Sequence, residues 1–589
     1  MSFPSLDQFF TQVDSIAEVQ KNSCHRNVVE VPDPIWIDVQ GKLPSWLNGV
    51  LYRIGPGKFI LGDQQEGARS ITITHAFDGL AYIHRFEFDA AQQKVRYNSR
   101  HTAKAYEKEV LENPFGGHGS FGTVYAIGAA WHRFMDFLAR TNKKDIRYED
   151  MDPSSSTVSV TLTPNFPLPS AWDGTSQQRI LVAKTDHNIL QKVHHDTLEP
   201  ERLFDYSSYD PRLNGRLCAS HHQHDDSTLE AFNVTMSIGP DTCLKVFKID
   251  DATSAVTVLA EIRDNLDASN TPFKPAYIHS FWMTQHYVVV PISPIHFRNQ
   301  GLDLAVSGNL MGSMEWHQDE PTLFYVVSRD PSVGHIATIP VDSHFAFHTV
   351  HGRDFIDPAT GHAVLELNTQ AFDGCETPFQ VHNINNVTRA NDIAARDQDE
   401  ADRKKSQKTV HGFTTPPSRL TTFGDLRRYR VVLDKDAPQT SSTASYRVLA
   451  KNAEFARVHP SFQFKDYRYV YFNYFVAGVN GQQGERYGLK KIDLLDGQET
   501  VWQPDTHNAY MCSEPTFVPR PGATDEDDGV VLSLTSVFDN RGPEHDHCYM
   551  LVLNATDFSE FARIPLGQFT ATTFHGSFVD HEFITNSYN

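Results

Sequence analysis

Short segments with the composition of β-strands recur from about residue 50 to the C-terminus. Each is rich in Val, Tyr, Phe and Ile and is bounded by Gly, Pro, Asp or Asn. No long alternation of helices and strands accompanies them. A fold with this many strands must protect the edges of its sheets, and a β-propeller does this by radial repetition of its blades. The pattern therefore predicts an all-β, closed fold. The expected strands are Arg179–Lys184, Leu229–Ile238, His286–Ile292, Leu323–Val327, Arg468–Phe475, Gly529–Ser536 and Cys548–Leu553.

The domain organisation follows from where this pattern holds and where it stops. Residues 28–589 are expected to form one β-propeller domain, and residues 1–27 a tail or helix packed outside it. Residues 388–418 are highly charged, and residues 434–445 are rich in Ser and Thr. Both compositions predict flexible loops. No internal repeat is visible, so the sequence pattern itself does not give the number of blades.

The charge and the cysteine content exclude several classes of protein. The 52 Lys and Arg against 73 Asp and Glu give a net charge of -21, which repels nucleic-acid phosphates. Six cysteines without a CxxC spacing argue against a disulfide scaffold and a thiolate zinc site. No apolar run of 18 residues and no targeting signal are visible, so we expect a cytoplasmic protein. The 29 histidines are an excess that motivates a search for metal ligands.

One helix candidate differs from the rest of the chain. Residues 124–140 read VYAIGAAWHRFMDFLAR, with apolar side chains at helical spacing. Such a helix either packs on the core or dips into one membrane leaflet, which would make the protein peripherally membrane-associated. The candidate docking residues are Ile127, Trp131, Phe134, Met135, Phe137 and Leu138.

Seven motifs, far apart in the sequence, carry a family resemblance. Four contain a histidine: ASHHQHDDSTLEAFN with His222, YIHSFWMTQHYVV with His279, FAFHTVHGRD with His348, and FHGSF with His575. The others are LPSWLNGVLYRIGPG from Leu43, HAFDGLAYIHRFEF from His75 and SEPTFVPRPGATDEDDGVVLS from Ser513. In their order and spacing, from about Leu43 to Phe578, they resemble the carotenoid cleavage oxygenase family.

The resemblance implies a seven-bladed β-propeller with a helical and loop cap over an axial metal site. Four histidines would hold Fe(II), and O2 would cleave a C=C bond to give two carbonyl products. Independently of the family, four neutral imidazoles suit a borderline divalent metal such as iron, copper or zinc. The ligands implied by the motifs are His222, His279, His348 and His575.

The first ligand position has competing neighbours. His221, His222 and His224 all lie in the same motif. Counting back from Asn233 and Asp226, which resemble the family's pattern, gives the ligand position to His222. His221 and His224 would then lie beside the site or in a loop.

Ligand histidines normally donate their second N–H to an acceptor, and the family uses three carboxylates for this. At position 186 the family usually has Glu, and the shorter Asp would reach its histidine either directly or through a water. His351 replaces a usual Asn and is either an extra polar group near the metal or a hydrogen-bonded loop residue. The implied pairs are Asp186 with His279, Glu454 with His348, and Glu514 with His575.

The family contains enzymes acting on carotenoids, apocarotenoids, stilbenes and retinyl esters. Stilbene cleavers hold a phenol with a Lys immediately before the carboxylate at position 186. Here that residue is Thr185, and Lys184 is one position away, which on a strand turns its side chain to the opposite face. The lysine that would hold a phenol is therefore missing from its place.

The predicted function is an Fe(II)-dependent dioxygenase that cleaves a carotenoid or apocarotenoid, with retinal as one conceivable product. Its partners would be an apolar polyene, O2 and a membrane surface, with no nucleic acid and no obligate protein partner. The alternatives are a stilbene-cleaving dioxygenase on the same iron centre, a non-oxidative isomerase or hydrolase of retinoid esters, and a non-catalytic binding platform.

Overall fold

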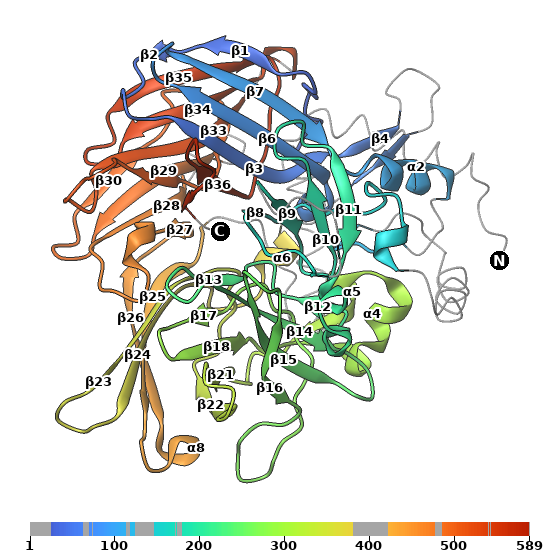
Figure 1. The fold of residues 1–589 in the computed structure, drawn as a ribbon, viewed down its shortest axis with the longest axis vertical. Helices are drawn as coiled ribbons and strands as arrows, with labels where there is room; N and C mark the ends of the chain where they lie inside the picture. The colour runs from blue at the N-terminus through green and yellow to red at the C-terminus, as the bar shows by residue number, and fades with distance from the viewer. Residues whose placement is uncertain are drawn as a thin grey trace, which may run out of the picture.

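A computed structural model describes residues 25–62, 70–73, 75–113, 118–123, 147–170, 172, 179–380, 422–476, 486–539, 541 and 543–587. In these ranges the regular structure of the chain is mostly antiparallel strands arranged around a centre (Figure 1). The all-β prediction is confirmed. The seven segments expected to be strands correspond to β9 (Leu181–Lys184), β14 (Glu230–Ser237), β18 (Tyr287–Ile292), β21 (Thr322–Ser328), β28 (Tyr469–Phe475), β33 (Gly529–Phe538) and β34 (His547–Asn554).

Seven groups of strands form the blades in the described part of the chain. The first contains β1 (Ile35–Asp38), β7 (Lys94–His101), β6 (Leu80–Asp89), β3 (Gly49–Lys58), β36 (His575–Val579) and β37 (Thr585–Ser587). The second contains β11 (Pro200–Phe204), β10 (Leu190–Val193), β9 and β8 (Thr161–Pro164). The third contains β12 (Leu217–Cys218), β13 (Gln223–Asp225), β14, β15 (Cys243–Asp250) and β16 (Val256–Ile262). The fourth contains β17 (Trp282–Met283), β18, β21 and β22 (His335–Val341).

The remaining blades follow the same order along the chain. The fifth contains β23 (Thr349–Ile356), β24 (Ala363–Ala371), β25 (Asp425–Leu433) and β26 (Thr443–Ala450). The sixth contains β27 (Glu454–Arg457), β28, β29 (Arg486–Asp493) and β30 (Glu499–Trp502). The seventh contains β31 (Ala509–Cys512), β32 (Thr516–Pro519), β33, β34, β35 (Glu560–Gly567) and β2 (Gln40–Gly41). A short parallel pairing of β29 with β31 joins these last two into one sheet.

The ring closes by pairing the two ends of the chain. C-terminal β36 lies antiparallel to N-terminal β3, with Val50 opposite Val579 and Ile54 opposite His575. This pairing leaves neither strand with a free edge, which removes a site for aggregation. It also places His575 at the inner end of a blade, so closure of the ring and construction of the central site depend on the same pairing.

Short helices and two-stranded ribbons connect the blades. The α-helices are α2 (Lys104–Glu112), α4 (Leu302–Ser307), α5 (Leu310–Ser313), α6 (Thr377–Gln380) and α8 (Pro438–Ser441). The 3-10 helices are η1 (Ala76–Asp78), η2 (Tyr148–Asp150), η3 (Tyr206–Ser208), η4 (Pro211–Leu213), η5 (Arg298–Gly301), η7 (Pro460–Phe462) and η8 (Pro543–His545). The ribbons pair β4 (Ile60–Gly62) with β5 (Ser70–Thr72), and β19 (Ile295–Phe297) with β20 (Met314–Trp316).

Residues 434–445 contain some regular structure. The short helix α8 and the start of β26 lie within them. The Asp434 carboxylate accepts hydrogen bonds from the backbone N–H groups of Asp436 and Ala437, which fixes the turn after β25. Ser and Thr can hydrogen-bond to nearby backbone as well as to water, so a Ser/Thr-rich composition also suits a tight turn.

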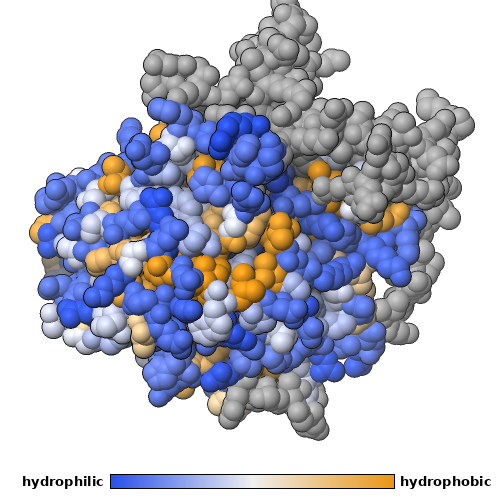
Figure 2. Space-filling model, turned by 90° about the horizontal axis from the view of Figure 1, so that it is seen from above, coloured by the Kyte–Doolittle hydropathy of each residue, from blue (hydrophilic) through white to orange (hydrophobic). Residues whose placement is uncertain are grey.

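Two other sequence predictions lie outside the described residues, and a third, the N-terminal tail, lies mostly outside them. Residues 388–418 and the helix candidate at 124–140, with all six docking residues, fall outside, as does the tail up to residue 24. Among the helices that the structure describes, none has the length and apolar character needed to cross a bilayer. The face seen in Figure 2 is mostly hydrophilic, with hydrophobic residues gathered near its middle.

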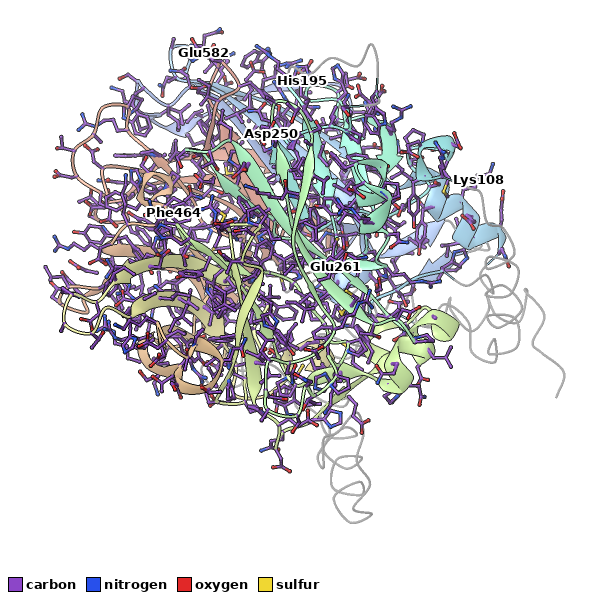
Figure 3. The ribbon with its side chains drawn as sticks, turned by 60° about the horizontal axis from the view of Figure 1, so that its bottom comes forward. Lys108, His195, Asp250, Glu261, Phe464 and Glu582 are labelled. Atoms are coloured by element: carbon purple, nitrogen blue, oxygen red, sulfur yellow. The ribbon has the colours of Figure 1, made fainter. Side chains whose placement is uncertain are left out.

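The core lies between neighbouring blades, where their apolar faces pack. Side chains fill the space that separates the strands in a ribbon view, while Lys108 and Glu582 lie at the outer edge (Figure 3). Trp282 of β17 joins the fourth and fifth blades: its indole N–H donates to the Asn368 carbonyl at 2.7 Å, and it packs edge-on to Phe324. Only 1% of Trp282 is exposed, so this contact is well shielded from water.

We expect Trp282→Ala to lower the free energy of unfolding by about 3–5 kcal/mol, the range for large buried aromatic side chains. The same substitution at Trp36, which is 51% exposed on β1, should change stability by less than about 1 kcal/mol. Thermal unfolding at one scan rate, followed by circular dichroism, compares the two. Equal shifts of the midpoint would show that the blade interface does not depend on Trp282.

Candidate metal centre

Four histidines from four blades meet at the centre of the ring. His221 lies between β12 and β13, His279 precedes β17, His348 precedes β23, and His575 begins β36. One nitrogen of each lies within 4.8 Å of the corresponding nitrogens of the other three. All four side chains are buried. The arrangement therefore fits a divalent metal held by four imidazoles.

The prediction of His222 as the first ligand is corrected by this geometry. The ring of His221 lies 4.3 Å from that of His575 and 4.9 Å from that of His279, whereas His222 is turned away from the centre. The Nδ1 atom of His222 contacts the ammonium of Lys184, and its ring packs edge-on to Phe166. The segment between β12 and β13 is not a strand, so strand alternation could not show which neighbour faces the axis.

Three of the histidines contact carboxylates through Nδ1. The Nδ1 atom of His348 lies 2.7 Å from Glu454 Oε2, that of His575 lies 3.0 Å from Glu514 Oε1, and that of His279 lies 2.9 Å from Asp186 Oδ1. Because each Nδ1–H then donates to a carboxylate, each Nε2 keeps its lone pair for a metal. His221 has no carboxylate partner among the described residues.

Asp186 reaches His279 directly, which resolves the question left open by its short side chain. Its other contacts come from the hydroxyls of Tyr277, at 2.7 Å, and Ser220. Burial by itself would raise the pKa of Asp186, but His279 and these hydroxyls hold the pKa below its ordinary value. The carboxylate therefore stays ionised and keeps the N–H of His279 pointed at it.

A β-bulge in β27 places two charged side chains at the centre. The register against β28 shifts between Glu454 and Arg457. Phe455, between them, has a positive φ of 54°, an uncommon conformation for a bulky residue, and its ring lies 5.1 Å from that of His348. The bulge directs Glu454 to His348 and Arg457 to Glu514, so one irregularity supports two ligands.

Glu514 is held by two guanidinium groups that the sequence motifs did not assign. Arg457 Nη2 lies 2.7 Å from Glu514 Oε1, and Arg53 Nη1 lies 3.4 Å from Oε2. Burial opposes ionisation, but Arg457, His575 and Arg53 lower the pKa of Glu514 far below its ordinary value. The neighbouring Gly576 permits this packing, because a Cβ there would overlap Arg53. The sequence did contain one indication of this contact. Arg53 lies in the apolar strand β3, and a buried cation requires a partner.

The ring nitrogens at the centre have the properties of unfilled metal ligands. The Nε2 atoms of His221 and His348 are fully buried, and no described residue pairs with them. Burial lowers the pKa of His221 well below its ordinary value and that of His575 to about 3, so both are neutral near pH 7. Neutral imidazole is the form that binds a metal, and a buried unpaired nitrogen is costly without one.

The other polar residues singled out from the sequence lie away from the cluster. His351 is on β23, where its Nε2 contacts the carbonyl of Phe462 at 2.9 Å, so it is a hydrogen-bonded structural residue. His224 pairs with Asp226 and Asp251, which raise its pKa to about 9 against the effect of burial.

A cavity of about 210 Å³ opens onto three of the histidines, His279, His348 and His575. The short elements η1 and α5 and the connecting loops contribute to its lining, as expected of a cap. Phenylalanines are the commonest lining residues: Phe77, Phe121, Phe347, Phe372, Phe423, Phe455 and Phe574. A second, more polar cavity of about 140 Å³ contacts His221 and His348 from another side.

We expect His221→Ala to abolish or strongly weaken binding of a divalent metal, while His222→Gln retains it. Gln keeps a hydrogen-bond acceptor for Lys184, so the second variant is a matched control for a change in this motif. Metal content by plasma mass spectrometry and circular dichroism of both variants test this. Loss of metal from His222→Gln but not from His221→Ala would show that His222 is the ligand, as the sequence motif predicts.

Glu514→Gln should weaken metal binding by about 10- to 100-fold, the usual effect of removing such a partner. Asp186→Asn should cause a similar loss, because its contact with His279 is also direct. Glu112→Gln, at a largely exposed position on α2, is the control. Competition with a fluorescent chelator measures the affinities. A much smaller loss for Asp186→Asn would indicate that a water replaces this carboxylate easily.

Comparisons with known proteins agree with this geometry. Torulene dioxygenase from Fusarium fujikuroi is 29% identical over 565 residues, covering 92% of this chain and 90% of that protein. The carotenoid dioxygenase of Neurospora crassa is 26% identical, with 94% and 90% covered. Cobalt-substituted Synechocystis apocarotenoid oxygenase aligns with a TM-score of 0.65 at 20% identity, over 96% of this chain and 99% of that one, which confirms the propeller fold.

The family comparison covers nearly the whole chain. A family model described as "Retinal pigment epithelial membrane protein" matches residues 25–580, a range that includes the four central histidines and their three carboxylates. The chain therefore belongs to this family, the carotenoid cleavage oxygenases that its motifs resemble.

Proposed function

We propose that the protein is an Fe(II)-dependent dioxygenase that cleaves a C=C bond of a carotenoid or apocarotenoid with O2, giving two carbonyl products. The observation that carries the proposal is the four-histidine cluster at the wall of a cavity rich in phenylalanine. The names of the relatives, torulene dioxygenase and carotenoid dioxygenase among them, support the same reaction and substrate class.

The residues that would hold the iron are His221, His279, His348 and His575. When bound, Fe(II) supplies a centre that binds O2 and makes it reactive toward an electron-rich double bond. Four neutral ligands would leave the ion its full positive charge. The three carboxylates hold the N–H groups of three ligands, so the protein fixes the geometry before metal arrives.

The main contribution of the cavity would be to bind and position the substrate. A polyene has almost nothing to hydrogen-bond, so its affinity comes from buried apolar area, at about 25 cal/mol per Å². Phe347 lies 5.5 Å from His279, and Phe455 lies 5.1 Å from His348, ring centre to ring centre. These rings would press the double bond against the histidine cluster and exclude water from it, and the depth of the cavity would select the bond.

The stilbene alternative loses its main support in this cavity. Lys184 is 2% exposed and contacts His222, and it does not line the cavity. Thr185 lines it instead. No lysine or arginine is among the described lining residues, so a phenolate finds no cation there.

The test is product analysis by mass spectrometry. Iron-loaded protein is given β-carotene, apocarotenals or resveratrol in detergent, with and without O2. We expect carbonyl products from polyenes only with O2, carrying label from 18O2, and their masses identify the cleaved bond. Hydroxybenzaldehydes from resveratrol, without polyene cleavage, would contradict the proposal, and so would products formed equally well without O2.

A further inference from the structure

The cavity is lined by different chemistry on two of its sides. On the side of the second blade it is lined by Thr157, Ser159, Thr185 and His187, which we call the polar arm. On the side of the fifth to seventh blades it is lined by Phe372, Phe423, Tyr487 and Met511, which we call the aromatic arm. The strands beside these arms, β8 and β9 against β25 and β29, lie on opposite sides of the centre (Figure 1). A substrate bound across both arms would have unlike ends.

The hydrophilic side chains of the polar arm lie just beyond the paired ends of β8 and β9, with the apolar Val160 among them. The N–H of Val160 bonds to the Lys184 carbonyl at 3.1 Å, and β8 pairs with β9 from Thr161 opposite Lys184. Continued by one residue, this register places Val160 opposite Thr185, so Ser159 and His187 follow on the two sides of that pair and also line the cavity. The carboxylate of Asp186, between Thr185 and His187, faces His279. The polar arm therefore begins beside the histidine cluster and lies at the ends of paired strands.

His187 is the strongest hydrogen-bonding group of the polar arm. Its side chain is partly exposed, lines the cavity, and has no hydrogen-bond partner among the described residues. Burial lowers its pKa, so the ring is neutral near pH 7 and offers one N–H donor and one acceptor. The hydroxyls of Ser159 and Thr185 likewise have no described partner. Unpaired polar groups in an apolar cavity are costly unless a ligand or water satisfies them.

The charges near this arm distinguish among oxygenated ligands. The charged groups near His187 are the carboxylates of Asp78 and Asp186 and the guanidinium of Arg216, which does not line the cavity. Asp78 accepts hydrogen bonds from the N–H groups of Phe121, Gly122 and Thr123, and Asp186 faces His279. The described lining residues include no lysine or arginine to neutralise an anion. A carboxylate on the ligand would be repelled there, whereas a neutral carbonyl or hydroxyl oxygen would meet donors without repulsion.

We propose that His187 is a specificity-determining residue that hydrogen-bonds a neutral oxygen at one end of the polyene, so that the preferred substrate is an apocarotenal or hydroxylated polyene with one apolar end. The oxygenated end lies in the polar arm and the hydrocarbon end in the aromatic arm. This inference rests on the proposed function, because it assumes that the cavity takes a polyene. It adds an orientation, which fixes the double bond beside the histidine cluster.

The first test compares three ligands with the same carbon skeleton, ending in an aldehyde, a carboxylic acid or a methyl group. Iron-loaded protein without O2 binds them without consuming them, and quenching of tryptophan fluorescence gives each Kd. We expect the aldehyde to bind about ten-fold more tightly than the hydrocarbon, the effect of one net hydrogen bond. The acid should bind more weakly than the aldehyde. Equal affinities for aldehyde and hydrocarbon would overturn the proposal.

Three variants test which residue causes the preference for the aldehyde. His187→Phe keeps the ring volume but removes the N–H, so it should abolish the advantage of the aldehyde while changing hydrocarbon binding less than about two-fold. His187→Gln returns a donor and should restore part of the advantage. Met511→Leu, in the aromatic arm, is the matched control and should change the affinities of aldehyde and hydrocarbon alike. An aldehyde preference that survives in His187→Phe would overturn the assignment.

The outcomes separate this inference from the proposed function. If no polyene yields an O2-dependent carbonyl product, the proposed reaction fails, whatever the binding preference. If polyenes are cleaved but the wild-type protein shows no preference for an oxygenated end, only the role of His187 fails. Should His187→Phe not fold, Thr185→Val removes a neighbouring donor and should reduce the aldehyde preference, and an unchanged preference there counts against the polar arm.

Discussion

Three buried hydrogen bonds between carboxylates and imidazoles are the constraint on which the centre depends. The four histidines have nitrogens within 4.8 Å of one another. If each of these nitrogens carries a lone pair, none can donate a hydrogen bond to another. Asp186, Glu454 and Glu514 solve this by accepting the second N–H of three rings. The carboxylates are in turn held by hydroxyls, a bulged strand and two guanidinium groups. The outer contacts therefore determine the inner geometry.

The propeller provides this arrangement because each of its seven blades supplies one side chain, either a histidine or a carboxylate, to the centre. The third, fourth, fifth and first blades each supply one histidine, and the second, sixth and seventh each supply one carboxylate. Every carboxylate thus ties its blade to another, and pairing of β3 with β36 brings the last histidine into place. Binding energy for a metal would be shared among all seven blades, so metal binding and closure of the ring reinforce one another.

The sequence predicts most of this structure, and its errors have physical causes. Strand positions follow from composition, because β-branched and aromatic runs between turn residues have few other solutions. The carboxylates and three histidines follow from motifs. The choice of His221 does not follow from them, because His221 and His222 are neighbours in a segment that is not a strand. His222 contacts Lys184 and Phe166, which leaves His221 to face the axis. The bulge at Phe455 and the role of Arg457 are set by tertiary packing, so local sequence does not reveal them.

The cavity shows why the same centre can serve different substrates. The histidines and carboxylates interact with one another and not with the substrate's ends, so changes in the arms leave them intact. Lys184 is the last residue of β9, and Thr185 follows it outside the strand. Here Lys184 is turned away and pairs with His222, while Thr185 and His187 face the cavity on either side of Asp186. This single segment orients one ligand through Asp186 and supplies polar groups to the cavity through Thr185 and His187, which couples the chemistry to the choice of substrate.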